Sequence, residues 1–522
     1  MSSHPQVNGP TSSEETQLNR ADEVEDLLDA VKSLILPFIR DADNAAPSRA
    51  SGTIAADAQG APGRNVLVDS HKPEDLVKKL GISMPEDGAG KEGLLDIIQT
   101  ILRYSVNTWD QGFMDKLYSS INPVGVISEL VLTTLNTNVH IYKTSPALTI
   151  IEKTTARRLA NLFGFTGPRA GGITCQGGSA SNLTSLVIAR NTLFPETKTS
   201  GNAGRQFALF TSAHGHYSVE KAAVTCGMGS SSVVSVPVDA SGRMQASALR
   251  AAILQARDQG KTPLYVNATA GTTVWGSYDP IAELAPVCED FGLWLHVDAS
   301  WGGPAIFSAA QRHKLAGSGH ARSLTVNPHK MLNAPVPCSF LLTPDVAVFR
   351  RANSLRAGYL FHDSADAEGG DAEAEAEVWD LADLTLQCGR RGDALHLALA
   401  WVYYGAAGFA RHVDGAFAAA ALLAARLHAH PDFALLSASP PPCLQVCFYY
   451  APGGVPASDA EENSRRTREM VRRLVARGFM VDYAPGESGS LVRAVVNCQT
   501  RSSTVEGLVK ALAEVGREVV PL

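Results

Sequence analysis

Short apolar runs alternate with helical patterns through the middle of the chain. After Gly171, each run is followed by turn residues, and helical periodicity fills most of the intervals between runs. Buried parallel strands have this appearance, because helices cover both faces of the sheet that they form. The pattern therefore predicts a doubly wound α/β fold for the centre of the chain. The candidate strands are 206–212, 232–238, 263–268, 292–298, 323–327 and 338–343.

The two ends of the chain follow other patterns. Residues 21–40 place apolar side chains at helical spacing, and a stretch rich in Ala, Gly, Ser and Pro at 41–65 is interpreted as a linker. Beyond residue 430, strands and helices alternate on a smaller scale. We therefore expect a disordered tail at 1–20, an N-terminal helical segment at 21–144 that contains the linker, a large α/β domain at 145–430 and a small α+β domain at 431–522.

Composition excludes several classes of function. Of the 522 residues, 45% are hydrophobic and 19% are charged, and the formal net charge is -7. This balance gives neither the basic footprint of a nucleic-acid-binding protein nor a polybasic membrane patch. No apolar run approaches the ~20 residues of a membrane span. The eight cysteines form no CxxC pair, so we expect a cytoplasmic protein with reduced thiols and no metal ion.

Two ionisable residues end buried strands. Asp298 follows the apolar run 292–297, and Lys330 follows the run 324–326. Burial disfavours a charged lysine, which makes its amine a nucleophile toward a carbonyl group. A buried carboxylate needs a cationic partner, which a protonated pyridine nitrogen would supply. The pair indicates pyridoxal 5'-phosphate (PLP) held as a Schiff base on Lys330, although a core ion pair and a turn lysine would look the same in isolation.

Three further segments end at the same edge of the predicted sheet. They read QGGSASN (176–182), HGHYS (214–218) and NATAGTT (267–273). Paired glycines and amide groups at a helix N-terminus suit an anion, and a histidine can stack on a flat ring. Each segment alone is explained by a turn. Together they indicate a ligand site, because ligands of such sheets bind at the carboxyl ends of the strands.

The same motifs carry a family resemblance. The resemblance covers about residues 95–520, with the matching motifs in the right order. They are QGGSASN, HGHYS, NATAGTTVWGSYDP, WLHVDASWGG, NPHKM, AGYLF, QCGRRGD and SLVRAVVN. The chain resembles the group II PLP-dependent amino-acid decarboxylases. This implies PLP fold type I, as in aspartate aminotransferase, with a mostly parallel central sheet. WGG, where the aromatic-substrate enzymes have YAG, points to the branch that acts on glutamate, cysteine sulfinate or aspartate.

The resemblance implies roles for individual residues. Lys330 would carry the Schiff base, Asp298 would pair with the pyridine nitrogen, and His216 would stack on the ring as a catalytic residue. Tyr359 would protonate Cα after carbon dioxide leaves. Arg493 would bind a substrate carboxylate, which calls for a bidentate cationic partner. The remaining cofactor-binding residues would be Ser179, Ala180, Ser181, Thr273, Asn327 and His329.

Three positions in the expected substrate pocket depart from the glutamate enzymes. Lys116 replaces a neutral amide, Tyr118 replaces a smaller serine, and His140 replaces a phenylalanine. A shorter and more cationic pocket would favour aspartate or cysteine sulfinate over glutamate. Two other arrangements remain open, because Tyr118 could turn away from the pocket and Lys116 could pair with Asp115.

The sequence therefore predicts decarboxylation of an acidic L-amino acid, with L-aspartate to β-alanine and CO2 as the leading reaction. L-Glutamate to GABA and cysteine sulfinate to hypotaurine are the alternatives. Decarboxylation with oxidative deamination to an aldehyde is a further one, which Tyr359 disfavours. A non-catalytic scaffold is disfavoured by the intact set of site residues. The resemblance also implies a homodimer with sites at the interface, and the acidic stretch 362–378 is interpreted as a solvated loop or a lid.

Overall fold

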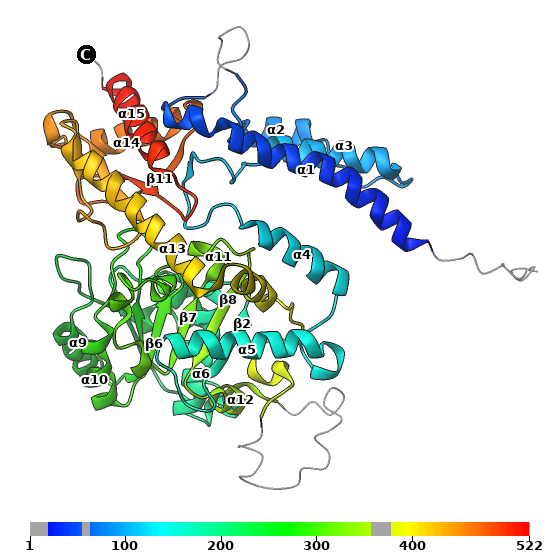
Figure 1. Cartoon of the computed structure of the whole chain (residues 1–522). Helices are drawn as coiled ribbons and strands as arrows, with labels where there is room; N and C mark the ends of the chain where they lie inside the picture. The colour runs from blue at the N-terminus through cyan, green and yellow to red at the C-terminus, as the bar shows by residue number, and fades with distance from the viewer. Residues whose placement is uncertain (1–18, 55–62, 356–376, 521–522) are drawn as a thin grey trace, which may run out of the picture.

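The computed structural model describes residues 19–54, 63–355 and 377–520, and their strands form two sheets (Figure 1). The larger sheet has the order β2-β8-β7-β6-β5-β3-β4. Strand β8 is antiparallel to β2 and β7, and the other neighbours are parallel. Its strands are β2 (Gly171–Cys175), β3 (Phe207–Ser212), β4 (Val233–Val236), β5 (Thr262–Thr269), β6 (Trp294–Ala299), β7 (Ser323–Val326) and β8 (Ser339–Thr343). The predicted α/β fold and its candidate strands are confirmed.

Helices cover the large sheet, and its central strands therefore have no face open to water. Every residue of β6 and of β7 is buried, as expected for strands that read as continuous apolar runs. The covering helices are α5 (Pro146–Leu162), α6 (Gly178–Leu193), α8 (Ser218–Thr225), α9 (Ala246–Asp258), α10 (Ile281–Phe291) and α12 (Val346–Asn353). The short helices α7 (Thr197–Ser200) and α11 (Pro328–Met331) follow α6 and β7.

The smaller sheet combines distant parts of the chain. Its order is β1-β11-β12-β10-β9, from β1 (Phe113–Met114), β9 (Phe433–Leu435), β10 (Gln445–Tyr450), β11 (Met480–Ala484) and β12 (Leu491–Val495). Strand β1 belongs to the N-terminal segment, yet it pairs in parallel with β11, with Phe113 opposite Met480. Helices α14 (Ala460–Ala476) and α15 (Ser502–Val519) pack against this part of the molecule. Two residues were too few to be recognised as a strand from their pattern.

Long helices connect the two sheets and extend the molecule. Helix α13 (Ala394–Ala429) runs from the large sheet to the small one and bends at Gly405, whose φ is 67° (Figure 1). Helices α2 (Pro73–Leu80) and α3 (Gly90–Tyr104) lie beside α1 (Arg20–Ala50) in an arm, and α4 (Pro123–Leu135) follows. Among the described residues, no helix combines the length and the apolar character needed to cross a membrane.

The N-terminal helix is longer than predicted. The sequence predicts a helix over 21–40 and a linker over 41–65, whereas α1 continues to Ala50. The alanines of this stretch favour a helix, and Ala42, Ala45 and Ala46 are buried. Helix α1 packs on α15, where a Cβ at Gly507 would lie 1.9 Å from the Arg49 carbonyl oxygen. Residues 55–62 of the predicted linker and 1–18 of the predicted tail lie outside the described residues.

A buried ion pair fixes the end of α1. Arg49 donates from Nε to Asp110 Oδ1 at 2.8 Å and from Nη2 to Asp110 Oδ2 at 2.7 Å. The two side chains are 1% and 0% exposed. A bidentate pair of this kind is strong when complete, but removal of one partner leaves the other charge buried without compensation.

Arg49→Met is therefore expected to lower the free energy of unfolding by about 3–5 kcal/mol, because Asp110 keeps its burial and loses its partner. Thermal or denaturant unfolding measures this loss. The control is Lys32→Met, which removes an ion pair with Asp29 whose side chains are 64% and 69% exposed. That change should cost less than about 1 kcal/mol. Equal effects of the two variants would refute the structural role of Arg49.

Candidate active site

A cavity of about 240 Å³ lies at the carboxyl ends of strands β3, β5, β6 and β7. It brings together seven of the residues singled out from the sequence, from five separate motifs. They are Ser179, His216, Thr273, Asp298, Asn327, His329 and Lys330. The other lining residues are Gly178, Asn182, Tyr217, Thr269, Gly271, Ser300 and Trp301. The predicted convergence of these motifs at one sheet edge is therefore present in the fold.

Asp298 is held as a buried anion. Its Oδ1 accepts the backbone N–H of Ser300 at 3.1 Å, and its Oδ2 accepts an amide N–H of Asn182 at 2.8 Å. Burial alone would raise the pKa of this carboxyl, but the hydrogen bond from Ser300, the charge of Lys330 and the hydrogen bond from Asn182 lower the pKa below its ordinary value. The side chain thus presents a negative charge to a cationic ligand group.

Lys330 stands in the short helix α11, just beyond the end of β7. Burial lowers the pKa of its amine, and the nearby Asp298 carboxylate partly offsets that shift. A lowered pKa increases the fraction of neutral amine, which is the form that attacks a carbonyl carbon. The geometry therefore supplies a nucleophile and an anion in one cavity.

Two neutral imidazole rings also line the cavity. Burial lowers the pKa of His216, although Asp298 acts in the opposite direction, and burial lowers the pKa of His329 to about 4. The Nδ1 of His216 accepts the backbone N–H of Ser218 at 3.2 Å, which leaves Nε2 as the protonated nitrogen. Uncharged flat rings are suited to packing against a flat heteroaromatic ligand.

The start of helix α6 forms a cradle for an anion. Gly177 has a φ of 91°, and a Cβ at Gly178 would lie 2.6 Å from Ser300 Oγ and 2.8 Å from the side-chain amide of Asn327. Within the described part of the chain, Ser300 Oγ is a buried atom without a hydrogen-bond partner. A helix N-terminus favours a phosphate, and the missing Cβ leaves room for one. The residues present therefore fit the phosphate, the pyridine nitrogen and the aldehyde carbon of PLP.

Other residues expected at the site lie outside this lining. The N–H of Ser181 donates to the Gly177 carbonyl at 3.0 Å, and its hydroxyl pairs with Ser339 Oγ at 2.9 Å. Ala180 packs against an apolar cluster. His140 is half-buried, with Nδ1 3.2 Å from the Asn138 carbonyl oxygen. Tyr359 and residues 362–376 of the acidic stretch lie outside the described residues.

The two basic residues expected to bind the substrate both contact one carboxylate, that of Asp482, which the sequence did not indicate. Arg493 Nη2 donates to Asp482 Oδ2 at 2.7 Å, and Lys116 Nζ donates to the same oxygen at 2.9 Å. Lys116 also lies 3.3 Å from Asp115, the open alternative noted above. Tyr118 is 45% exposed. The pocket is thus less cationic than predicted, because Asp115 and Asp482 offset the two positive charges.

Arg493 still has donors to offer. Its Nη1 donates to the carbonyl of Thr273 at 2.9 Å, which places the guanidinium beside a residue that lines the cavity. Its side chain is 7% exposed. Among the described residues, its Nε is a buried donor without a partner. A ligand carboxylate would satisfy that donor.

Sequence reasoning missed Asn182, Ser300 and Asp482. The first two left a signal, since Asn182 ends the QGGSASN motif and lies one helical turn beyond Gly178. Ser300 follows Asp298 by two residues, the spacing at which an aspartate commonly accepts a backbone N–H. Asp482 left none, because its contact with Lys116 spans 366 residues.

A second acidic group lies next to the anion cradle. Asp393 accepts the Gln176 amide at 3.3 Å, and its Oδ1 has no hydrogen-bond partner among the described residues. Burial raises the pKa of Asp393 to about 7, against the opposing charge of Arg391. Between about pH 4 and pH 7 the unfolded chain carries this charge while the folded chain binds the proton. The free energy of unfolding therefore falls as the pH rises through this window.

Asp393→Asn removes that ionisation and keeps the shape of the side chain. Relative to the parent protein, the variant should gain stability as the pH rises from 5 to 8, by at most about 3 kcal/mol, because roughly two pKa units separate pH 5 from the folded pKa of about 7 and each is worth about 1.4 kcal/mol. Thermal unfolding midpoints at both pH values measure the change. A difference between variant and parent that is the same at pH 5 and pH 8 would contradict the raised pKa.

Comparisons with known proteins agree with this geometry. Residues 73–451 match the pyridoxal-dependent decarboxylase conserved domain. The chain is 60% identical over 504 residues to L-aspartate decarboxylase dtxS4 of Metarhizium robertsii, covering 96% of this chain and 99% of that protein. It is 40% identical over 491 residues to a glutamate decarboxylase-like protein of Gibberella zeae, covering 88% of this chain and 94% of that one.

Solved structures share the fold. The crystal structure of mouse CSAD superposes with a TM-score of 0.82 at 30% identity, covering 95% of this chain and 99% of that one. Oryza sativa TDC with PLP and tryptamine superposes with a TM-score of 0.83 at 22% identity, covering 96% and 99%. These likenesses confirm the expected fold type, and the match to the pyridoxal-dependent decarboxylase domain confirms the expected cofactor. The chain belongs to the pyridoxal-dependent decarboxylase family and is a PLP-dependent amino-acid decarboxylase.

Proposed function

We propose that this protein decarboxylates L-aspartate to β-alanine and carbon dioxide. The observation that carries the proposal is the 60% identity to a protein named L-aspartate decarboxylase over nearly the whole of both chains. The more distant relatives are named glutamate decarboxylase-like and CSAD. Glutamate and cysteine sulfinate are therefore the alternatives that must be compared directly.

Each residue of the cavity has a role that follows from its chemistry. When bound, PLP supplies an electron sink for the carbon that loses carbon dioxide. Lys330 would bind the cofactor covalently through its amine, and Asp298 would pair with the pyridine nitrogen and keep it protonated. His216 would offer its neutral ring to the face of the cofactor. The phosphate would be held by Ser179, Asn327, His329 and the N-terminus of α6, and Thr273 would serve the ring substituents; all of these residues line the cavity.

The substrate end is formed by Arg493 and its neighbours. The free Nε of Arg493 takes a substrate carboxylate and positions the bond to be broken. Lys116 and Tyr118 do not line the cavity, but they lie on the segment whose backbone at Asp115 contacts Arg493 Nη2 at 3.3 Å, which puts them near the expected substrate carboxylate. Tyr359, by resemblance, returns the proton to Cα and thereby favours the amine product over an aldehyde.

The test is a substrate comparison with the purified holoenzyme. L-Aspartate, L-glutamate and L-cysteine sulfinate are each supplied, and the products are identified by mass, with kcat/KM measured for each. We expect β-alanine as the preferred product. A higher kcat/KM for glutamate or for cysteine sulfinate would overturn the assignment of aspartate, and an aldehyde would overturn simple decarboxylation.

The contribution of Lys116 and Tyr118 to the expected preference for aspartate over glutamate can be tested by substitution. Lys116→Gln combined with Tyr118→Ser should move kcat/KM toward glutamate relative to aspartate by roughly 10- to 100-fold, the value of one charged contact. The matched control is Lys91→Gln, an exposed lysine that pairs with Asp26 at 2.6 Å. An unchanged ratio in the double variant would show that these two residues do not set the preference.

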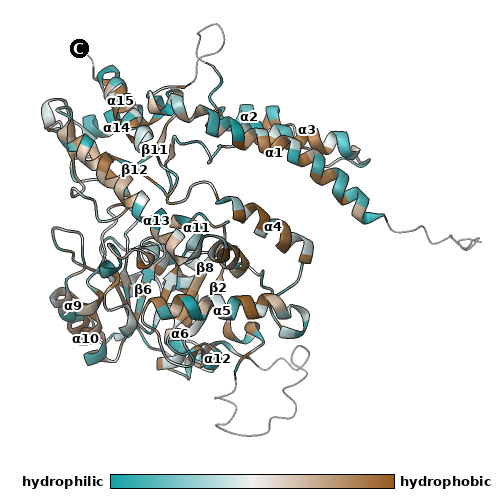
Figure 2. Cartoon of the chain, in the orientation of Figure 1, coloured by the Kyte–Doolittle hydropathy of each residue, from teal (hydrophilic) through white to brown (hydrophobic). Residues whose placement is uncertain are grey.

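We also infer a cytoplasmic homodimer with its sites at the interface. The eight cysteines, all within the described ranges, form no disulfide. Helix α4 is hydrophobic along most of its length (Figure 2), and several of its apolar residues are exposed. They are Val126, Ile127, Leu130, Val131 and Leu135. An exposed apolar band of this kind is typical of a protein interface, and sedimentation equilibrium tests whether the mass is that of two chains.

A further inference from the structure

A row of buried polar side chains extends from Asp298 away from the cavity. Asn182 bonds to Asp298 at 2.8 Å, and its carbonyl oxygen lies 3.1 Å from Nε2 of His296. The Nδ1 of His296 lies 2.8 Å from Ser323 Oγ, which accepts the indole N–H of Trp294 at 2.8 Å. All of these side chains are at most 5% exposed.

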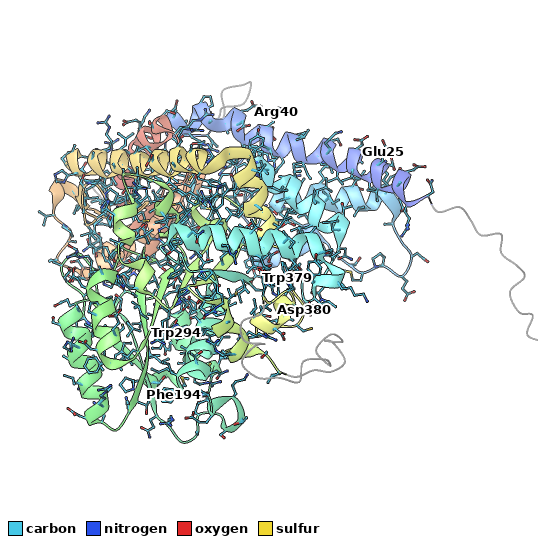
Figure 3. The ribbon with its side chains drawn as sticks, turned by 60° about the horizontal axis from the view of Figure 1, so that its bottom comes forward. Glu25, Arg40, Phe194, Trp294, Trp379 and Asp380 are labelled. Carbon is cyan, nitrogen blue, oxygen red and sulfur yellow. The ribbon has the colours of Figure 1, made fainter. Side chains whose placement is uncertain are left out.

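The strands explain why these residues line up. Trp294, His296 and Asp298 alternate along β6, so their side chains share one face of the sheet. Ser323 is the register partner of His296 on β7. Helix α6 crosses that face and presents Asn182 between His296 and Asp298. Trp294 is labelled in Figure 3 within the large domain.

The hydrogen bonds have one direction. An indole N–H can only donate, so Ser323 receives it and turns its own hydroxyl proton toward His296 Nδ1. His296 is then protonated on Nε2, which donates to the Asn182 carbonyl oxygen. Both N–H groups of Asn182 are used, one by Asp298 and one by Ser218 Oγ at 2.9 Å. The donors that link Trp294, Ser323, His296 and Asn182 therefore all point toward the Asp298 carboxylate, and only the second N–H of Asn182 leaves the row, toward Ser218.

Such a row of hydrogen bonds strengthens the electrostatic stabilisation of the Asp298 carboxylate, which stands at its end. Burial lowers the pKa of His296 to about 4, so the ring is neutral and relays polarisation without adding a charge. In a dry interior, successive hydrogen bonds of the same direction reinforce one another. The last donor in the row faces the oxygen of an anion that the mechanism requires to stay charged.

We propose that Asn182, His296 and Ser323 are positioning residues that hold Asp298 oriented and ionised for the pyridine nitrogen of bound PLP. The proposal rests on the role given above to Asp298. It does not depend on which acidic amino acid is the substrate. His296 and Ser323 do not line the cavity, and Asn182, which does, donates to Asp298; all three act through Asp298.

The experiment measures PLP binding rather than turnover. The holoenzyme of each variant is resolved to the apo form and titrated with PLP, and the absorbance of the bound cofactor is followed from pH 5 to pH 9. Asn182→Ala removes the direct hydrogen bond and should weaken PLP binding by roughly 10- to 100-fold, the value of a hydrogen bond to a charged group. The pH transition of the absorbance should also change. Ser323→Ala should give a smaller effect of the same kind, about 2- to 10-fold.

The matched control is Tyr265→Phe. Tyr265 is buried, stacks on the His296 ring with centroids 5.8 Å apart, and pairs its hydroxyl with Ser185 at 2.7 Å rather than with the row. This variant loses a buried hydroxyl beside the same ring, and it should keep both the PLP affinity and the absorbance profile. The comparison with this control therefore distinguishes a positioning role of Asn182 and Ser323 from a merely structural one.

The outcomes decide between these roles. Parental PLP affinity and an unchanged pH profile in Asn182→Ala, with only a lower unfolding midpoint, would overturn the proposal. If Asn182→Ala does not fold, Ser323→Ala decides, because it leaves the contact with Asp298 in place; parental behaviour of that variant would then overturn the relay. The substrate comparison uses only the parent enzyme, so a different preferred substrate would contradict the proposed function and leave this inference intact.

Discussion

Lys330→Ala is expected to abolish decarboxylation, with a loss of roughly 10³-fold or more in kcat/KM, because the amine that captures the cofactor covalently is removed. The fold should persist, since the substitution shortens a side chain that lines a cavity. Borohydride treatment of the parent holoenzyme should attach the cofactor to Lys330, and peptide mapping identifies the labelled residue.

The matched control is Lys314→Met. Burial also lowers the pKa of Lys314, which lies 5.5 Å from the Tyr278 ring centroid and 4.7 Å from that of Phe417, and it does not line the cavity. Low basicity is thus not unique to Lys330, and position relative to Asp298 is what distinguishes it. Label on Lys314, or retained turnover in Lys330→Ala, would refute the assignment.

Local pattern was sufficient for the large sheet. Each central strand is short, largely apolar and bounded by turn residues, because burial on both faces favours apolar side chains and admits polar ones only where they have hydrogen-bond partners. The edge on which the motifs converge follows from that topology, since parallel strands place their carboxyl ends together. Asp298 and Lys330 could therefore be predicted to meet without knowledge of any distance between them.

Contacts between distant segments could not be predicted in this way. The helical extension of α1 is stabilised by the Arg49 pair with Asp110 and by close packing on Gly507. Neither contact leaves a periodic signal in residues 41–50, where Ala, Ser and Pro resemble a linker. Asp482 is a similar case, because one carboxylate changes the electrostatics of both Arg493 and Lys116 from another strand.

Asp298→Asn should have the second largest effect, a fall in kcat of roughly 10²- to 10⁴-fold. Removal of one partner of a buried ion pair costs about 3–5 kcal/mol, and here the partner left behind is the pyridinium on which the electron sink depends. Asparagine keeps the shape of the side chain, so the loss reports charge. The KM should change much less, because Arg493 contacts Thr273 and Asp482 rather than Asp298.

The same variant has a second signature that a general loss of packing would not produce. The Asp298 carboxylate raises the pKa of Lys330 and of His216 against the effect of burial. Its neutralisation should therefore lower the pKa of the free Lys330 amine in the apo form and of His216, and the acid limb of the pH–rate profile of the holoenzyme, to which His216 contributes, should move to lower pH. Asp393→Asn serves as the control, since it replaces another buried carboxyl, one that does not line the cavity. A parental kcat in Asp298→Asn, or equal losses in both variants, would contradict a pairing of Asp298 with the cofactor.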